Sequence, residues 1–548
     1  MISGQKRLLL QTTRRPACCS RRARVQVKAV SEHQKNVVIV GQGWAGFGAA
    51  KHLSEQGYNV TLLEASPNPG GLASGWRTAS GREVEAGMKG FWYQYKNIFA
   101  LLEELELSEW PLTSWTTSGF WSPRGLVTEA PVFSTLPRLP TLVGQFVHTF
   151  PLYWSLSLED RLTMLPFLTT FIDFKSSEAT YERYDKMSAY ELFKLCGVSK
   201  AAYEEFLKPT LLVGLFAPPE QISAATMLET LYFYALAHQN DFDVCWCKGT
   251  IAERIFSPLI RRIEAKGGSI VGSRVVTGLE LGENGEVTAV KAMDKDTGLD
   301  TIYPADALVF AIGVGGMQKL VSSCPQLASL PEFRATMNLK SLDVVATRIW
   351  LDKKVNTKYP ANVLSGFEPV AGAGATYFHL NDLQDEYRDA PGSVITADFY
   401  NAAALLPLSD QDIVDRVKGH LETCEPAAFK GTQVLDSAVL RFPKAVTHFS
   451  PGSHQYRPYQ NTSIPNLFVA GDWVKGVLHG ANGLSQERAY VTGLIAANLV
   501  VDRLGMGSRA RILDTEPDEP HIQIAKEAAR QARMVIESLE SAAGNRRM

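Results

Sequence analysis

The sequence has no uninterrupted apolar run that would cross a membrane as a helix. Its longest stretch without Asp, Glu, Lys or Arg is residues 139–158, and a membrane-spanning helix needs about 20 residues. Pro140 and Pro151 interrupt this stretch, and helix interiors tolerate proline poorly. We therefore expect it to form a buried cap or an element that dips into a surface.

Cysteine is scarce and the net charge is small. The 548 residues include 7 cysteines, whose spacing matches neither a zinc site nor a thioredoxin motif. We expect reduced, mostly buried thiols and no metal site. A formal net charge of -2 argues against a broad nucleic-acid-binding surface, so we expect no nucleic-acid partner. The chain also lacks a nucleophile elbow and a paired-carboxylate motif, which is consistent with chemistry carried by a bound cofactor.

Acidic residues are absent from the first 31 positions, which carry Lys and Arg instead. A basic, hydroxyl-bearing and acid-free leader is typical of an organelle transit peptide. A disordered basic arm is the alternative, and composition alone does not separate a chloroplast from a mitochondrial address.

A short apolar run at residues 37–40 predicts a central parallel strand. It is followed by Gly-Gln-Gly-Trp-Ala-Gly at 41–46, by a helical pattern that closes at Gly57, and by a second apolar strand at 60–63 that ends in Glu64. An acid about 20 residues beyond a glycine-rich turn completes a dinucleotide-binding fingerprint.

Each part of this fingerprint has a physical role. Gly41 permits the tight turn, Gly43 lets the backbone approach a pyrophosphate, and Gly46 lets the helix pack close to the sheet. The N–H groups at the helix start and the helix dipole then face the phosphates, with Ala45 as a further contact in the same turn. We expect Glu64 to accept hydrogen bonds from ribose hydroxyls.

Three further segments extend this unit. A turn-rich segment ends in the glycine pair 70–71, a Gly-Asp step at 471–472 follows an apolar strand, and a strand with two valines begins near 275. Together they resemble flavoproteins of the FAD-dependent amine oxidase and carotene desaturase superfamily, which implies FAD as the cofactor. The resemblance adds these candidate contacts: Ala65, Gly70, Gly71, Leu72, Met88, Val275, Val276, Gly471, Asp472, Gly483, Leu484 and Ser485.

Residues 70–107 indicate one branch of this superfamily. Their glycine pair, acid, aromatic residues and Tyr95-Lys-Asn97 are similar to plant and cyanobacterial phytoene and zeta-carotene desaturases. Lys89 departs from the pattern because those enzymes usually carry His there. Glu-Arg-Ala at 487–489 replaces the usual Glu-Gly-Ala and is closer to the isorenieratene-synthase-type branch, which desaturates and rearranges carotene end rings. The substrate and reaction therefore stay open.

The predicted fold class is α/β, with a Rossmann-type FAD-binding domain assembled from discontinuous segments and a mixed helical and antiparallel-sheet substrate domain. The expected FAD-binding parts are 36–109, 248–322 and 441–505. The expected substrate-domain parts are 110–247, a helical cap, and 323–440. A transit peptide at 1–31 and a C-terminal tail with a helix at 506–548 complete the chain.

The two inserts are rich in large apolar side chains, which either pack a domain core or line an apolar tunnel. The resemblance implies a carotene desaturase-like enzyme that acts on a lipophilic polyene by hydride transfer to the flavin, with a quinone as electron acceptor. Lys89 and Arg457 are candidates for stabilising reduced flavin by charge. A carotenoid isomerase using reduced FAD, a flavin amine oxidase and a non-catalytic flavin- or pigment-binding assembly factor are the alternatives.

The leader and the resemblance together predict a chloroplast location, in the stroma or peripherally on the thylakoid or envelope membrane. In the tail, residues 521–541 place apolar side chains at the spacing of one helical face. That face either packs on the body of the protein or meets a partner or membrane surface.

Overall fold

The computed structural model describes residues 34–141, 143–174, 178–368, 370–477, 479–480 and 483–544. Residues 35–548 form one compact unit, and the predicted transit peptide lies outside the described residues. Across those described ranges, no helix has both the length and the apolar character needed to span a membrane. The described cysteines, Cys196, Cys245, Cys247, Cys324 and Cys424, are free thiols.

A five-stranded parallel sheet forms the base of the predicted FAD-binding domain. Its strand order is β19-β13-β1-β2-β9. Neighbouring residues of a strand point to opposite faces; thus Val37 and Ile39 of β1 enter one core and Val38 and Val40 the other. The strands are β1 (Asn36–Val40), β2 (Asn59–Leu63), β9 (Ser269–Val271), β13 (Ala307–Phe310) and β19 (Leu467–Val469).

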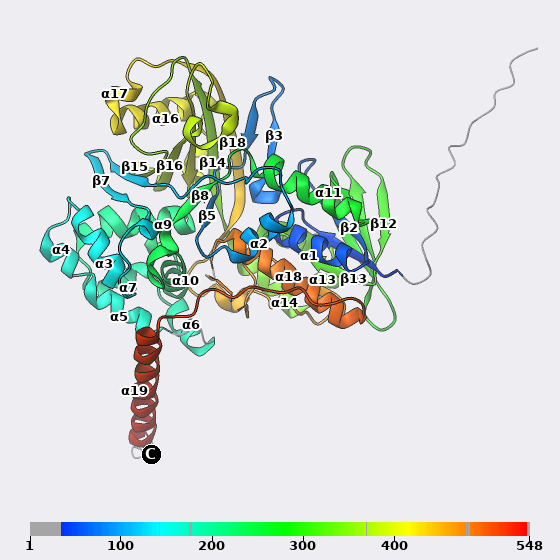
Figure 1. Cartoon of the computed structure of the whole chain (residues 1–548). Coiled ribbons are helices and arrows are strands. Elements are labelled where there is room, and N and C mark those ends of the chain that lie inside the picture. Colours follow the sequence, from blue (N-terminus) through cyan, green and yellow to red (C-terminus); the bar gives the residue numbers. More distant parts are fainter. Residues whose placement is uncertain are drawn as a thin grey trace, which may run out of the picture. The chain divides into compact units, whose positions relative to one another are not determined.

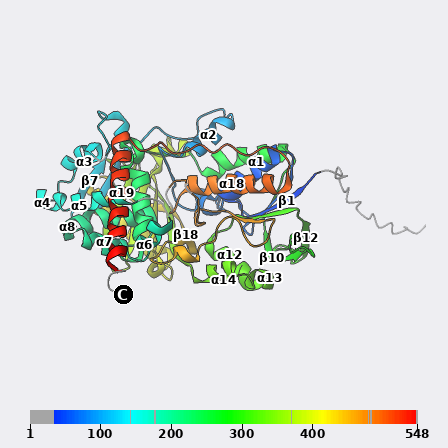
Figure 2. The same cartoon turned by 90° about the horizontal axis from the view of Figure 1, so that it is seen from below.

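Helices and a small second sheet cover the two faces of this sheet. On one face, α1 (Trp44–Glu55) and α18 (Gln486–Leu504) pack side by side (Figures 1 and 2), with α11 (Ser257–Ala265) next to α1. On the other lie α12 (Val314–Ser323), α13 (Pro325–Ala328), α14 (Pro331–Ala335) and the antiparallel strands β10 (Arg274–Leu281), β11 (Val287–Asp294) and β12 (Asp300–Pro304). Segments far apart in sequence thus build one dinucleotide-binding fold, as predicted.

A seven-stranded mixed sheet forms the base of the predicted substrate domain, in the order β18-β14-β17-β16-β15-β6-β7. All its pairs are antiparallel except β15 with β6. Its strands are β6 (Ser118–Ser122), β7 (Gly125–Ala130), β14 (Lys340–Leu351), β15 (Ala361–Glu368), β16 (Ala373–His379), β17 (Val394–Tyr400) and β18 (Val434–His448), and α16 (Asp410–Cys424) and α17 (Pro426–Phe429) cover one face. Because β18 runs on to His448, the expected boundary between the substrate domain and the last FAD-binding part, at 440/441, falls inside a strand. The strands β6 and β7 also add a hairpin to the segment that was expected to be a helical cap.

The helical cap packs against the end of this sheet through Leu342, Val344 and Val446. Two of its helices begin with capping boxes, Ser157 with Asp160 and Ser188 with Glu191, which satisfy backbone N–H groups at the helix start. The cap helices are α3 (Val143–Thr149), α4 (Leu158–Leu162), α5 (Leu165–Asp173), α6 (Glu178–Asp185), α7 (Ala189–Leu195), α8 (Lys200–Ala202), α9 (Lys208–Leu215), α10 (Ala224–Leu231) and the π-helical turn η6 (Tyr232–Leu236).

Short elements join the two domains. Two ribbons, β3–β4 and β5–β8, lie between the parallel sheet and the seven-stranded sheet, together with the short helix α15, while the helix α2 packs beside α18. Their bounds are β3 (Gly75–Arg77), β4 (Glu83–Glu85), β5 (Gly90–Trp92), α2 (Lys96–Glu104), β8 (Val244–Trp246) and α15 (Leu380–Leu383).

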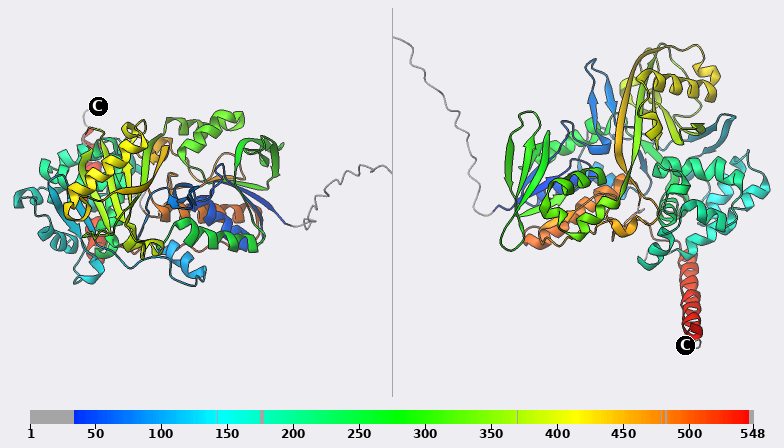
Figure 3. Two further views of the ribbon diagram at one scale, coloured as in Figure 1. Left: turned by 90° about the horizontal axis from the view of Figure 1, so that it is seen from above. Right: turned by 180° about the vertical axis from the view of Figure 1, so that it is seen from behind.

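After α18 the chain runs back from the FAD-binding domain to the cap. The N–H of Leu513 donates to the side chain of Asn97, and the carbonyl of Pro517 contacts the ring of His238. The predicted tail helix is α19 (Pro520–Gly544), which contacts α5 and then extends away from the cap (Figure 3). Ile522 is buried, whereas Ile524 is exposed, so Ile522 at the start of the helix packs on the body.

Candidate functional site

The glycine turn after β1 fits the predicted phosphate-binding role. Gly41 has φ 108°, and a Cβ atom there would stand 2.3 Å from the carbonyl oxygen of Ala311. A Cβ atom at Gly46 would stand 1.8 Å from the carbonyl oxygen of Gly41, whereas one at Gly43 would meet no atom within 4 Å. The first and third glycines are therefore required by packing, and the second faces open space at the start of α1.

The second loop lies on this turn. The N–H of Gly70 donates to the carbonyl of Gln42 at 2.7 Å, and a Cβ atom at Gly71 would stand 3.4 Å from Cα of Gly43. The Glu64 carboxylate accepts the N–H groups of Gln42 and Ser66, each at 2.9 Å. Residues 64–71 and the glycine turn thus form one continuous surface.

The valine strand joins this surface at its outer side. The N–H of Arg274 donates to the carbonyl of Glu64 at 2.7 Å. β10 is an edge strand of the three-stranded sheet, so the outer backbone groups around Val275 and Val276 have no strand partner. Backbone contacts to an adenine, which the resemblance implies for these valines, fit this placement. Leu72 is 43% exposed.

The Gly-Asp turn lies beside the glycine turn, although more than four hundred residues separate the two. Gly41 borders Ala311 and Ile312, and a Cβ atom at Gly471 (φ 138°) would stand 4.0 Å from the carbonyl oxygen of Ile312. Both turns therefore flank the end of β13. This is the juxtaposition that a dinucleotide held by both ends of the chain requires.

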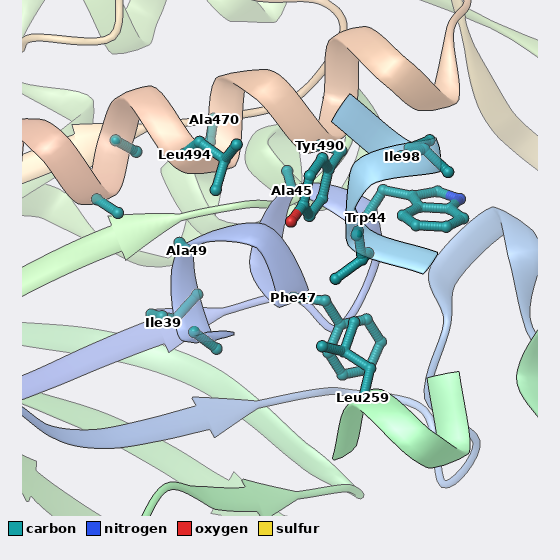
Figure 4. Packing of buried hydrophobic residues seen from close by; sticks show 14 of the residues in the cluster. Ile39, Trp44, Ala45, Phe47, Ala49, Ile98, Leu259, Ala470, Tyr490 and Leu494 are labelled. Atoms are coloured by element: carbon teal, nitrogen blue, oxygen red, sulfur yellow. The ribbon is translucent and has the colours of Figure 1, made fainter. Parts of the chain in front are cut away.

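The N-termini of α1 and α18 converge at the same place. Nε1 of Trp44 donates to Oε1 of Gln486 at 2.9 Å, and a Cβ atom at Gly493 would stand 2.1 Å from the carbonyl oxygen of Ala45. Figure 4 shows Trp44 and Tyr490 packed between these helices. Two helix starts present unpaired N–H groups and the positive end of their dipoles, which favours an anionic ligand.

Asp472 and Ser485 stand at the two ends of the loop that precedes α18. Burial raises the pKa of Asp472 to about 6, opposed by the charge of Arg488 and by the N–H of Ser485. The hydroxyl of Ser485 caps α18 by accepting the N–H of Arg488. The carbonyl of Leu484 accepts the hydroxyl of Tyr234, which also contacts the hydroxyl of Tyr95 at 3.1 Å.

Lys89 lies over its own backbone turn. Its Nζ donates to the carbonyls of Ala86 at 2.7 Å and Gly87 at 3.0 Å. Oδ2 of Asp398 accepts the N–H of Met88 at 2.9 Å, while Oδ1 of Asp398 is buried without a hydrogen-bond partner. Burial lowers the pKa of Lys89 and raises that of Asp398 to about 6, and the attraction between the two charges opposes both shifts.

Two candidates have side chains turned to other partners. Met88 packs with Trp350 and Phe378 on the seven-stranded sheet, and its backbone N–H is taken by Asp398. Arg457 is buried and donates to the carbonyls of Trp473 at 2.6 Å and Val474 at 3.1 Å. The catalytic roles of Lys89 and Arg457 stay predictions.

Some residues of the site were not predicted from the sequence. Gln42 is buried and donates from Nε2 to the carbonyls of Leu62 and Val271, a bridge between strands that no motif specifies. Asp398 could have been recognised from the sequence as a candidate site residue, because it is the single charged residue in the apolar strand 394–400.

The fold and the site define a dinucleotide-binding protein, and comparison with known proteins gives the family. Residues 44–501 match the family profile described as flavin containing amine oxidoreductase. The chain therefore belongs to this family, and it is an FAD-dependent oxidoreductase of the amine oxidase and carotene desaturase superfamily.

Curated relatives and solved structures agree with this assignment. The 15-cis-phytoene desaturase of Synechococcus elongatus is 23% identical over 480 residues, covering 85% of this chain and 96% of that protein. The carotenoid phi-ring synthase of Streptomyces griseus is 28% identical over 504 residues, covering 88% and 90%. The structure of putrescine oxidase with bound putrescine aligns with a TM-score of 0.63 at 14% identity over 86% of this chain and 99% of that one, which shows a shared fold.

The residues present fit FAD. The space in front of Gly43 and the two helix starts suit a pyrophosphate, and Glu64 suits a ribose. Asp472, Gly483, Leu484 and Ser485 would then hold the ribityl chain and the flavin ring. Every one of these positions is contributed by the part of the chain that the structure describes.

Proposed function

We propose that this protein oxidises a carotene, in a desaturase-like reaction of carotenoid metabolism. The relatives above, whose names refer to phytoene, zeta-carotene and a carotenoid ring, support a lipophilic polyene as substrate. The proposal also depends on the surface that the cap presents to the flavin end of the site.

That surface is mainly apolar and aromatic where it meets the start of α18, with the hydroxyl of Thr230 as a polar group. A Cβ atom at Gly483 would meet Oγ1 of Thr230 at 2.9 Å and Cδ2 of Leu215 at 3.0 Å, and one at Gly480 would meet the ring of Phe233 at 3.4 Å. An amine substrate would need groups that bind a cation, whereas a polyene needs apolar walls. This composition is the observation that favours a carotene over an amine.

The proposed reaction removes a hydride and a proton from neighbouring carbons of the polyene. Bound FAD supplies the two-electron acceptor for such an oxidation. The proton released when the new double bond forms needs an acceptor, and Asp398 with Lys89 supplies titratable groups beside the Gly87–Met88 turn. A cation delocalised along the polyene needs little further stabilisation by the protein.

The test is anaerobic mixing of the purified full-length holoenzyme, without an added acceptor, with phytoene, zeta-carotene or a ring-bearing carotene in liposomes. A plastoquinone analogue is then added as acceptor so that product accumulates over many turnovers. We expect the visible flavin band to bleach on mixing with one of these carotenes and a more unsaturated product to separate by chromatography. Benzylamine and putrescine are tested in parallel as amine substrates. Bleaching by an amine and by no carotene would disprove the carotene assignment.

The G43V variant is the matched control, because its side chain fills the open space at the predicted pyrophosphate position. A product made equally by wild type and by this FAD-free variant would exclude flavin chemistry. An isomerised product without loss of hydrogen would instead favour the carotenoid isomerase.

Oxidation within an end ring is a second candidate. It is favoured by the 28% identity to the phi-ring synthase and by Arg488 in the Glu-Arg-Ala step. Product mass and absorption from the same incubations separate the two, because ring oxidation needs a cyclic carotene whereas chain desaturation acts on phytoene or zeta-carotene.

We propose peripheral membrane contact through an apolar patch on α3–α5 and the turns between them. Its exposed side chains are Val143, Val147, Trp154, Leu158, Leu162 and Leu165, each at least 41% exposed. Soluble proteins rarely expose so many large apolar groups on consecutive elements, and Trp prefers membrane interfaces. The patch belongs to the cap, which would let a polyene enter from a bilayer.

Liposome flotation tests this contact. We expect wild type to float and the W154S/L158S/L162S variant to stay in the soluble fraction. L299S is the control, because Leu299 is 68% exposed but lies beside β12 at the far domain. Equal flotation of all three proteins would contradict a role for the patch.

We also propose a chloroplast location and a quinone acceptor. The basic leader and the plant relatives named chloroplastic/chromoplastic support the first, and a lipophilic acceptor suits a membrane-bound substrate. Microscopy of the full chain fused to a fluorescent protein tests the location. A signal confined to mitochondria or cytosol would refute it.

A further inference from the structure

Two charged side chains at the first turn of α18, Glu487 and Arg488, are completely buried. They reach in different directions. The Glu487 carboxylate accepts the backbone N–H groups of Asn97 at 2.9 Å and Ile98 at 3.0 Å, and the side-chain amide of Asn97 at 2.7 Å. It therefore holds the start of α2, the helix that follows the Met88–Tyr95 segment.

Arg488 holds the loop that follows the Gly-Asp turn. Its guanidinium donates from Nε to the carbonyl of Asp472 at 3.0 Å and from one terminal nitrogen to that of Val474 at 3.0 Å. The other terminal nitrogen donates to the carbonyls of Val477 at 3.1 Å and His479 at 3.0 Å. One side chain thus satisfies four carbonyls spread over eight residues.

The described residues of this loop, 472–477, 479–480 and 483–485, form no regular helix or strand, so their buried carbonyls depend on donors from elsewhere. A guanidinium carries five N–H donors in a planar fork and is suited to that task. Arg457 adds two bonds, to the carbonyls of Trp473 and Val474. No other residue described here is shown to bind four carbonyls of this loop.

We propose that Arg488 is a positioning residue for FAD, because it fixes the four carbonyls of Asp472, Val474, Val477 and His479 beside the expected place of the ribityl chain and the flavin ring. The side chain does not have to touch the cofactor. The inference depends on FAD as the cofactor and not on the identity of the substrate.

The arrangement of charge supports this role. Asp472 is partly open and lies at the start of the loop, with Arg488 bound to its own carbonyl. The positive charge of Arg488 also opposes the effect of burial on the Asp472 carboxyl, and so favours the ionised form that accepts hydrogen bonds from ligand hydroxyls. Glu487 and Arg488 together connect both walls of the expected flavin site to one helical turn.

The test is a titration of the full-length apoprotein with FAD. Binding is monitored by the quenching of flavin fluorescence and by the visible circular dichroism of the bound flavin. For R488G we expect the Kd for FAD to rise at least about tenfold and the dichroism to change. Millimolar guanidinium chloride should restore part of the affinity by filling the vacated site, whereas NaCl at equal ionic strength should not. R503A is the matched control, because Arg503 is in the last turn of the same helix and pairs with Glu286 at the surface.

R488K provides a second measurement in case R488G does not fold. An ammonium keeps the charge but has three donors on one atom, which do not span four carbonyls, so we expect a Kd between those of wild type and R488G. Wild-type affinity and dichroism in R488K, or equal responses of R488G to guanidinium and NaCl, would overturn the proposal. Neither result would bear on the carotene assignment, because no carotene is present.

Discussion

Removing one partner of the buried Arg348–Glu85 ion pair should strongly destabilise the junction between the two domains. Arg348 lies in β14 of the seven-stranded sheet, and Glu85 ends β4 beside the Gly87–Lys89 turn. The atoms of the pair are 2.9 Å apart, and the side chains are 3% and 5% exposed. Arg348 also donates to the carbonyl of Glu83, and Gln384 donates to Glu85.

The magnitude follows from this burial. Breaking a buried pair leaves one uncompensated charge, which lowers the free energy of unfolding by about 3–5 kcal/mol. We expect a loss of that size for E85Q and for R348M. The double variant E85Q/R348M removes both charges, so its loss should be close to that of one single variant, with a coupling of about 3 kcal/mol.

Urea unfolding, monitored by tryptophan fluorescence, measures the free energy of unfolding of wild type, the two single variants and the double variant. The control is D300N, which breaks the exposed Lys291–Asp300 pair (both side chains 46% exposed) and should lower the free energy of unfolding by less than about 1 kcal/mol. Additive losses in the double variant, or single losses no larger than that of D300N, would refute the reasoning.

Further predictions concern the glycine turn and two shifted pKa values. G43V should keep the stability of the apoprotein but bind no FAD, whereas G46A should lower the thermal midpoint even without FAD because its Cβ meets a carbonyl. Because burial raises the pKa of Asp398 to about 6, wild type should lose stability as pH rises from about 4 to 6, by roughly 3 kcal/mol, and D398N should not. Burial lowers the pKa of His238, but the hydrogen bond and charge of Asp241 outweigh it and raise that pKa to about 9. The free energy of unfolding that the His238–Asp241 pair contributes should therefore be fully present below about pH 6.5 and be lost as the pH rises towards 9. H238Q should abolish that alkaline loss in thermal midpoints measured against pH.

The glycine turn was predictable because its requirements are local. A carbonyl 2.3 Å from the place of a Cβ atom at Gly41, and 1.8 Å at Gly46, leaves no alternative to glycine, and the strand-turn-helix order is written in consecutive residues. The same holds for the β10–β11 hairpin around Gly285, whose φ is 74°.

Long-range pairings were not predictable in this way. β6 pairs in parallel with β15, so that Phe120 lies opposite Val363, yet an alternating apolar pattern does not specify which strand is its neighbour. This is why the segment 110–247 was expected to be a helical cap, without the β6–β7 hairpin that the structure adds. The side chain of Glu487 likewise meets Asn97 only in the folded chain.

Lys89 and Arg488 were both recognised as departures, but the sequence did not give their partners. One points back to the carbonyls of Ala86 and Gly87, and the other into four carbonyls of a loop. In each case a cation is satisfied by backbone oxygen and not by a carboxylate. Backbone acceptors carry no residue identity, so no pattern of side chains reveals such a site.

The placement of these cations bears on how one fold serves different substrates. A polyene, the substrate proposed above, offers no polar group for recognition, so under that proposal titratable side chains near it are free to serve proton transfer or the geometry of the cofactor. Here Asp398 and Lys89 stand at one wall of the expected flavin site and Arg488 behind the other, while the cap presents Leu215, Phe233 and Thr230 between them. The cap also brings one charge near this site, because Glu229 of α10 lies close enough to Arg488 to act on its guanidinium, while Leu215 and Phe233 supply apolar contact.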